Sequence, residues 1–144
     1  MSSTNIDYQI IHYQGDTFLL DFVYSDDDDT PIDLSNASAE MQIRRSPLHN
    51  KIVCRITSEY PSGIYHRNED SDFYYNEGIR GGTGGIILNN NGVTGAVYIE
   101  IDAETVSKIP AARHFYDLQV VFNDPYEVRT ILNGTFELAR EVTR

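Results

Sequence analysis

Apolar and polar residues alternate with a period of two along most of this chain, which is the pattern of β-strands with one buried face. The 3.6-residue period of amphipathic helices is almost absent. We therefore expect an all-β chain, folded as an antiparallel β-sandwich of roughly eight short strands. The residues expected to face its core are Phe18, Leu20, Phe22, Tyr24, Ala39, Met41, Ile43, Ile52, Cys54, Ile56, Val97, Ile99, Ile101, Tyr116, Leu118, Val120 and Phe122.

Turn and helix signals interrupt this alternation in the second half of the chain. The sequence NDP at 123–125 predicts a turn, and NG at 133–134 predicts a second turn before a last strand. One short connecting helix is expected over residues 102–109, because Asp102 can cap its first turn and Pro110 ends it.

Residues 59–85, EYPSGIYHRNEDSDFYYNEGIRGGTGG, do not follow the strand pattern. The segment is too polar and glycine-rich for a core and too long for an ordinary hairpin loop. We expect one domain over residues 1–144, from which 59–85 departs as a loop insertion.

The charge balance narrows the classes of partner. The chain of 144 residues has 22 acidic and 11 basic side chains, a formal net charge of -11. This charge opposes binding to nucleic acid or to an anionic membrane. Cys54 is the only cysteine, so no internal disulfide is expected, and the N-terminus lacks the pattern of a secretory signal. We expect synthesis in a cytoplasm.

The acidic run SDDDDTP at 25–31 raises the question of a metal site. Calcium loops place carboxylates at alternate positions, with a glycine in the turn and a closing glutamate. Here the Asp residues are contiguous, without that glycine or glutamate. A solvated turn between two strands is the favoured interpretation, and a weak cation site is the alternative.

No other motif predicts catalysis or a bound cofactor. The sequence GGTGG at 81–85 lacks the Lys of a phosphate-binding loop and precedes a strand rather than a helix. The four histidines show no zinc-type spacing, and His66 with Asp70 and Asp72 is the nearest approach to a ligand cluster. Cys54 alternates into the core and is expected to be a small apolar residue. We expect no enzyme, no cofactor and no metal.

Four segments carry a resemblance in their order along the chain. They are YQGDTFLLDFVY, TPIDLSNASAEMQIRR, GIILNNNGVTGAVYIEIDAETVSKIP and FYDLQVVFNDPYEVRTILNGTFELAREVTR. Together the segments resemble a family of small virion proteins of tailed bacteriophages, related to the N-terminal domain of upper baseplate and tail-fibre attachment proteins. The match covers nearly the whole chain except 59–85, where the family usually has a much shorter loop.

This resemblance implies a fold and a role. The implied fold is an Ig-like, Greek-key β-sandwich. The implied role is a non-enzymatic part of the virion, in its tail, neck or baseplate, that contacts other virion proteins and further copies of itself. Individual residues fit such a fold: Gly15-Asp16 can form a turn, Asp33 can accept backbone N–H bonds, and Tyr116 can bury its ring while its hydroxyl bonds a backbone group.

The aromatic residues of the 59–85 segment keep a second function class open. They are Tyr60, Tyr65, Phe73, Tyr74 and Tyr75. Tyrosine is enriched at protein interfaces, and its ring also stacks on sugars. The alternative to a virion assembly role is therefore a carbohydrate- or host-surface-binding module that uses this segment.

The closing segment, residues 134–143, gives the last candidate interface. Phe136 and Leu138 should face inward in a strand at the border of a sheet, with unpaired backbone groups. Arg140 and Arg144 could then bond an acidic surface on a neighbouring copy. Two solubilising arginines near a frayed end are an equally good interpretation.

Overall fold

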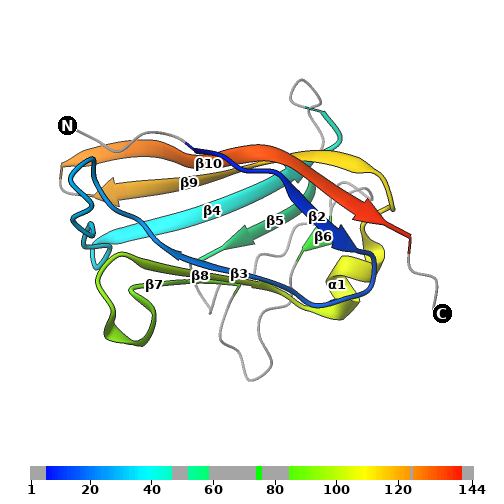
Figure 1. Cartoon of the computed structure of the whole chain (residues 1–144), viewed down its shortest axis with the longest axis horizontal. Coiled ribbons are helices and arrows are strands. Elements are labelled where there is room, and N and C mark those ends of the chain that lie inside the picture. Colours follow the sequence, from blue (N-terminus) through cyan, green and yellow to red (C-terminus); the bar gives the residue numbers. More distant parts are fainter. Residues whose placement is uncertain (1–5, 47–51, 59–73, 76–84, 124, 141–144) are drawn as a thin grey trace.

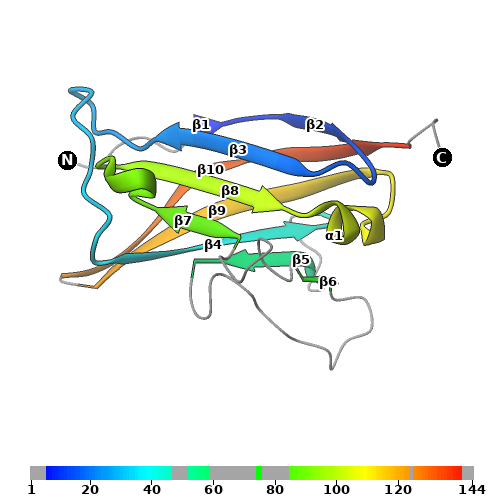
Figure 2. The same cartoon turned by 90° about the horizontal axis from the view of Figure 1, so that it is seen from below.

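The computed structural model describes residues 6–46, 52–58, 74–75, 85–123 and 125–140. Two β-sheets pack face to face in these residues (Figures 1 and 2). Sheet A contains β1 (Ile6–Asp7), β2 (Ile10–Tyr13), β4 (Ala37–Arg44), β5 (Ile52–Thr57), β6 (Tyr74–Tyr75), β9 (Arg113–Asn123) and β10 (Tyr126–Ala139). Sheet B contains β3 (Phe18–Val23), β7 (Ile86–Leu88) and β8 (Ala96–Ile101).

The strands follow the order β1-β10-β9-β4-β5-β6 in sheet A, where β2 also pairs with β10, and β3-β8-β7 in sheet B. Most neighbours are antiparallel, as the alternation predicted. The pairs β1–β10, β2–β10 and β5–β6 are parallel and were not predicted. The expected two-sheet, all-β architecture is confirmed.

The core lies between the two sheets and consists of the residues that the alternation predicted. Of the seventeen named above, thirteen have buried side chains, and Leu20, Phe22 and Phe122 are partly buried against the same cluster. The side chain of Ile52 is outside the described residues. Cys54 is fully buried, and this burial raises the pKa of its thiol to about 12, so the prediction of an apolar core role is confirmed.

The short helix α1 (Ala103–Lys108) covers one end of the sandwich, between β8 and β9 (Figures 1 and 2). It is two residues shorter than the predicted segment 102–109. Val106 and Ile109 are fully buried and anchor it to the core. A 3-10 turn, η1 (Asn90–Gly92), connects β7 to β8. Neither of these helices is long and apolar enough to cross a membrane.

The acidic run forms a closed turn, as its favoured interpretation predicted. Ser25 and Pro31 pair across its base. The Asp26 carboxylate accepts the N–H groups of Asp28 and Thr30 at 2.8 and 3.0 Å, while Asp27 to Asp29 are exposed to solvent. Two further predictions hold: Asp16 N–H bonds Tyr13 O in the turn after β2, and Ser35 N–H bonds the Asp33 carboxylate.

Two predictions about the last strand are wrong. The NG sequence at 133–134 is not a turn but lies inside β10, which has a bulge between Thr130 and Leu132. The closing strand is also not at a sheet border. Phe136 and Leu138 do face inward, but β10 pairs with β9 on one side and with β1 and β2 on the other. The N-terminal segment occupies the edge that the sequence suggested was open.

Candidate binding surfaces

The N-terminal residues 6–13, here called the N-terminal flank, form an edge strand added to β10. The β1 and β2 pairings keep the same register on either side of Tyr8, whose N–H donates to Asn133 O at 2.8 Å. After the flank, Gln14 ties the chain to the end of α1, because its side-chain amide donates to Ile109 O at 2.9 Å. The flank runs along one side of the sandwich (Figure 2).

Two residues of the neighbouring strands contact the flank at Tyr8. The Tyr116 ring is buried and its hydroxyl donates to Tyr8 O at 2.7 Å, which confirms the predicted burial and backbone bond. Burial also raises the pKa of this hydroxyl. Gly134 has a φ of +151°, and a Cβ there would lie 2.5 Å from Tyr8 O. The backbone of the flank therefore occupies the space that the side chain of any residue other than glycine would need at position 134.

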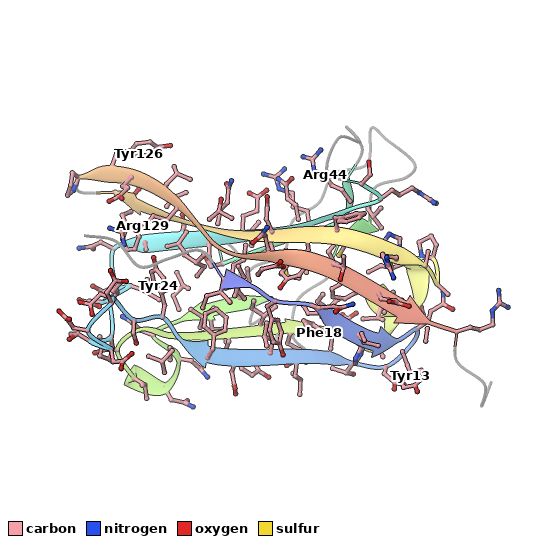
Figure 3. The ribbon with its side chains drawn as sticks, turned by 45° about the horizontal axis from the view of Figure 1, so that its top comes forward. Tyr13, Phe18, Tyr24, Arg44, Tyr126 and Arg129 are labelled. Atoms are coloured by element: carbon pink, nitrogen blue, oxygen red, sulfur yellow. The ribbon has the colours of Figure 1, made fainter. Side chains whose placement is uncertain are left out.

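The flank exposes large apolar side chains. Ile6, Tyr8, Ile11 and Tyr13 are 56, 45, 68 and 57% exposed. They account for four of the nine large apolar side chains that the described residues expose. In Figure 3, Tyr13 lies at one end of the long axis and Tyr126 at the other, whereas Phe18 is turned inward between the sheets. Among the described residues, no strand pairs with the outer side of the flank. The flank thus combines an unpaired strand edge with exposed apolar groups, the combination that proteins usually avoid leaving uncovered.

The outer face of sheet A forms a second surface, here called the polar face. It comprises Glu40, Gln42, Arg44, Arg55, Phe115, Asp117, Gln119 and Asn133. Strand register arranges these residues in rows: Gln42, Asp117 and Asn133 are cross-strand neighbours, with Arg55 beyond Gln42. A hollow of about 540 Å³ lies over them. That volume falls within the range of small-ligand sites.

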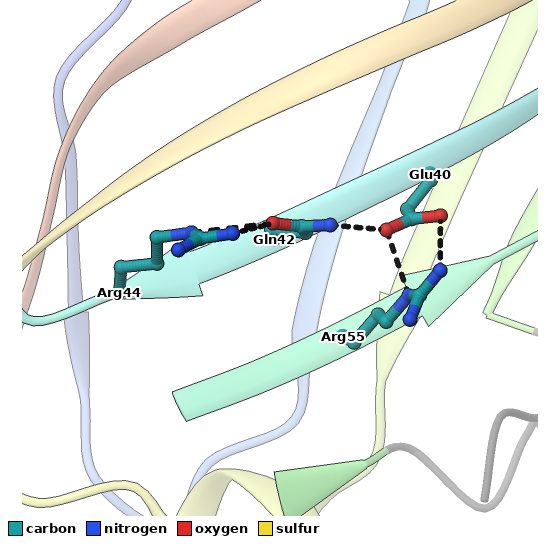
Figure 4. A network of polar contacts seen from close by, with 4 residues as sticks. All are labelled: Glu40, Gln42, Arg44 and Arg55. Carbon is teal, nitrogen blue, oxygen red and sulfur yellow. Dashed lines mark hydrogen bonds and ion pairs between the residues drawn. The ribbon is translucent and has the colours of Figure 1, made fainter. Parts of the chain in front are cut away.

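One half of the polar face is a connected network (Figure 4). The Arg55 guanidinium contacts both oxygens of the Glu40 carboxylate, at 2.9 and 2.7 Å. Gln42 donates to the same carboxylate through its amide nitrogen and accepts from Arg44 Nη2 at 2.7 Å through its oxygen. The side chains of Arg55 and Glu40 are only 22 and 27% exposed. Their positions are therefore fixed by bonds within the sheet rather than by solvent.

The other half of the polar face has no such network among the described residues. The side chains of Asp117, Gln119 and Asn133 make no hydrogen bond to any other residue in the part of the chain that the structure describes. Burial raises the pKa of the Asp117 carboxyl, Arg44 opposes this shift, and Glu40 adds to it. Phe115 stands beside these groups as a half-buried ring. This half offers polar groups that are free to bind a ligand.

The structure describes only some of the candidate interface residues that the sequence suggested. Tyr60, Tyr65, Phe73 and Arg144 lie outside the described residues. Tyr74 and Tyr75 form β6, which pairs with Cys54 and Arg55 of β5, so this part of the 59–85 segment extends sheet A. Arg140 follows β10 and is exposed.

Sequence reasoning missed the polar face. Its residues occupy the outward positions of the same alternation, as in AEMQIR over 39–44, and only the inward positions were assigned a role from the sequence. The signal that could have found them is that three consecutive outward positions of β4 all have hydrogen-bonding side chains.

The remaining candidates for metal binding or acid–base chemistry contain histidine. His66, Asp70 and Asp72 lie outside the described residues, and within those residues no group of three or more His, Cys, Asp or Glu side chains could hold a metal ion. His114 is buried, and its Nε2 donates to Pro110 O at 2.8 Å. Burial lowers the pKa of its imidazole.

Comparison with known proteins adds no relative. No family model matches the sequence, and no curated protein matches it.

Proposed function

We propose that this chain is a non-enzymatic structural component of a tailed-phage virion, in the tail, neck or baseplate, and that it binds neighbouring virion proteins or copies of itself. The motif order described above motivates the proposal. The observation that supports it best is the N-terminal flank, a free strand edge with Tyr and Ile side chains exposed.

The strand order supports an Ig-like topology of the variable type. In such domains one sheet has the order G-F-C-C′-C″, and the other contains B, E and D. The order β10-β9-β4-β5-β6 agrees with the first sheet, although β6 runs parallel to β5, and the order β3-β8-β7 agrees with the second. The helix α1 lies between the strands that correspond to E and F, and Tyr116 lies near the start of the strand that corresponds to F. The edges and loops of such a domain can vary without altering its core, so the fold is compatible with a role in contacts between proteins.

The flank fits a protein partner because of its chemistry. Edge strands accept a partner strand through backbone hydrogen bonds, and alternate side chains then give specificity. Ile11 and Tyr13 point outward beside Glu137 and Ala139 of β10, so they would lie in any contact made along this edge. Aromatic and aliphatic side chains are typical of interface cores.

The experiment uses particles of the phage that encodes the chain. Mass spectrometry of purified particles should detect the chain in a fixed ratio to the other virion proteins. Particles complemented with the double variant Ile11→Glu, Tyr13→Glu should lose it, because two carboxylates cannot be desolvated in an apolar contact.

The matched control is Val93→Glu, which alters a 50% exposed apolar residue in the β7–β8 connection. That variant should be incorporated normally. Particles that lack the wild-type chain, or that incorporate the flank variant as well as the wild type, would refute the proposal.

A further inference from the structure

The unbonded half of the polar face has the donor and acceptor pattern of a site for hydroxyl groups. Asp117 supplies an acceptor, whereas Gln119 and Asn133 each supply an amide with both a donor and an acceptor. A hydroxyl group both donates and accepts, so adjacent hydroxyls on a rigid ring can bond such a row in pairs. Asp117 and Asn133 are direct cross-strand neighbours, which places their side chains about 5 Å apart at Cβ.

The charges of the polar face indicate a neutral ligand. Two guanidinium groups, Arg44 and Arg55, face two carboxylates, Glu40 and Asp117, and Asp7, the register partner of Asn133, adds a third carboxylate at the edge, so the face has no net positive charge. The chain as a whole has a net charge of -11. An anionic ligand would meet both the carboxylate at Asp117 and this overall negative field. A cationic ligand would have to compete with Arg44 and Arg55, which already bond Gln42 and Glu40.

Phe115 adds an apolar contact at the edge of the same row. Its register partners are Arg44 on β4 and Thr135 on β10, so it lies one row from Asp117 on the same face. The negative face of an aromatic ring attracts the polarised C–H groups on the flat side of a sugar. A shallow hollow with one ring and several planar polar groups fits a sugar better than a flat protein surface.

We propose that the polar face of sheet A binds a neutral oligosaccharide, with Asp117 and Asn133 bonding its hydroxyls, Gln119 at the rim and Phe115 under the ring. Glu40, Gln42, Arg44 and Arg55 act as positioning residues that hold the neighbouring strand face rigid. This site uses other residues than the Tyr-rich segment 59–85, and it borders the N-terminal flank where Asp7 pairs with Asn133. The inference does not rest on a role in the virion.

The test is an NMR titration of the isotope-labelled full chain with lactose, maltose, cellobiose and chitobiose. At least one of these neutral sugars should shift the amide signals of Phe115, Asp117, Gln119 and Asn133. Asp117→Asn should weaken that binding about tenfold, because it removes a hydrogen bond to a charged acceptor. The control Asp21→Asn, on the exposed outer side of β3, should leave the affinity unchanged.

Sialyllactose serves as the anionic comparison, since it contains lactose with an added carboxylate. It should bind no better than lactose. The proposal is overturned if none of the four neutral sugars shifts these signals, if the shifts lie elsewhere, or if only sialyllactose binds. Retained affinity in a folded Asp117→Asn variant would also overturn it.

Discussion

The N-terminal flank and the polar face meet at Gly134 and Tyr116, yet they are built in opposite ways. The flank is an added strand with exposed Ile and Tyr side chains, held at Tyr8 by one hydroxyl and one glycine. The polar face lies on central strands, and half of it is cross-linked by the Glu40–Arg55 pair and the Gln42 bridge. The flank is therefore the part that can adapt to a partner, and the Glu40–Arg55 half of the polar face is the part that is preorganised.

In the two proposals above, one small sandwich has a protein contact and a sugar site on different surfaces. An apolar edge strand is suited to a permanent contact that removes it from water. A rigid array of polar groups is suited to a ligand that must be bound and released. The four changes below test this contrast, in order of decreasing expected effect.

Gly134→Ala should have the largest effect, because the new Cβ would lie 2.5 Å from Tyr8 O at a backbone angle that favours glycine. We expect the free energy of unfolding to fall by about 2 to 3 kcal/mol. Urea unfolding followed by circular dichroism measures this change. Hydrogen exchange at the Tyr8 amide should also accelerate, since its bond to Asn133 O is lost first.

Gly92→Ala is the matched control for that variant. Gly92 also has a positive φ, +75°, but a Cβ there would meet no atom within 4 Å. Its cost should be about 1 kcal/mol, with no change in exchange at Tyr8. Equal costs for the two variants would mean that the flank does not pack on Gly134.

Tyr116→Phe should lower the free energy of unfolding by about 1 kcal/mol, because it removes one hydrogen bond and keeps the buried ring. Tyr126→Phe, at a residue that is 74% exposed, should have no measurable effect. Chemical denaturation of both variants gives the comparison. No difference between them would show that the Tyr8 contact contributes nothing to holding the flank.

The alternation in the sequence predicted the core but not its edges. Positions such as Met41, Val97 and Leu118 had to face inward whatever the strand order, because a one-residue slip would expose them. Whether the NG sequence at 133–134 forms a turn or continues the strand depends instead on a contact with Tyr8, which is more than 120 residues away in the sequence. A local turn preference cannot encode such a contact.

The candidate binding residues were harder still to predict. Exposed tyrosines can be counted in a sequence, and five of the seven candidates were chosen because they are aromatic. The polar face, by contrast, forms only when β4, β5, β9 and β10 align, which brings Gln42, Asp117 and Asn133 into one row. Register between distant strands is set by tertiary packing, so no single segment shows it.

Glu40→Gln should lower the free energy of unfolding by about 1 kcal/mol, because the Glu40–Arg55 pair is bidentate and largely shielded from solvent. Glu137→Gln is the control. Its partner Arg113 is 3.9 Å away and both side chains are well exposed, so we expect a change below about 0.5 kcal/mol. If thermal unfolding shows equal shifts, the network of the polar face is no more rigid than an ordinary surface pair.

Asp117→Asn should have the smallest effect and the opposite sign. Burial raises the pKa of Asp117 above its ordinary value of 3.8, so the folded state favours the protonated carboxyl. Its stabilising contribution is present below pH 3.8 and is lost as the pH rises through the folded-state pKa. The Asn variant, which cannot ionise, should therefore unfold at a slightly higher temperature at pH 7.

The pH dependence of that difference is the check. Wild type and Asp117→Asn should converge as the pH falls below 3.8. A variant that is less stable than wild type at pH 7 would mean that the carboxylate is well bonded in the folded protein and is not free for a ligand.

The most direct test of the proposed virion role is a cryo-electron microscopy reconstruction of particles of the phage that we propose encodes this chain, with the chain located in the density. We predict that β1 and β2 lie against a neighbouring subunit and that the polar face of β4, β9 and β10 is open to solvent. A reconstruction in which another subunit covers the polar face while Ile11 and Tyr13 remain exposed would contradict the assignment of the two surfaces.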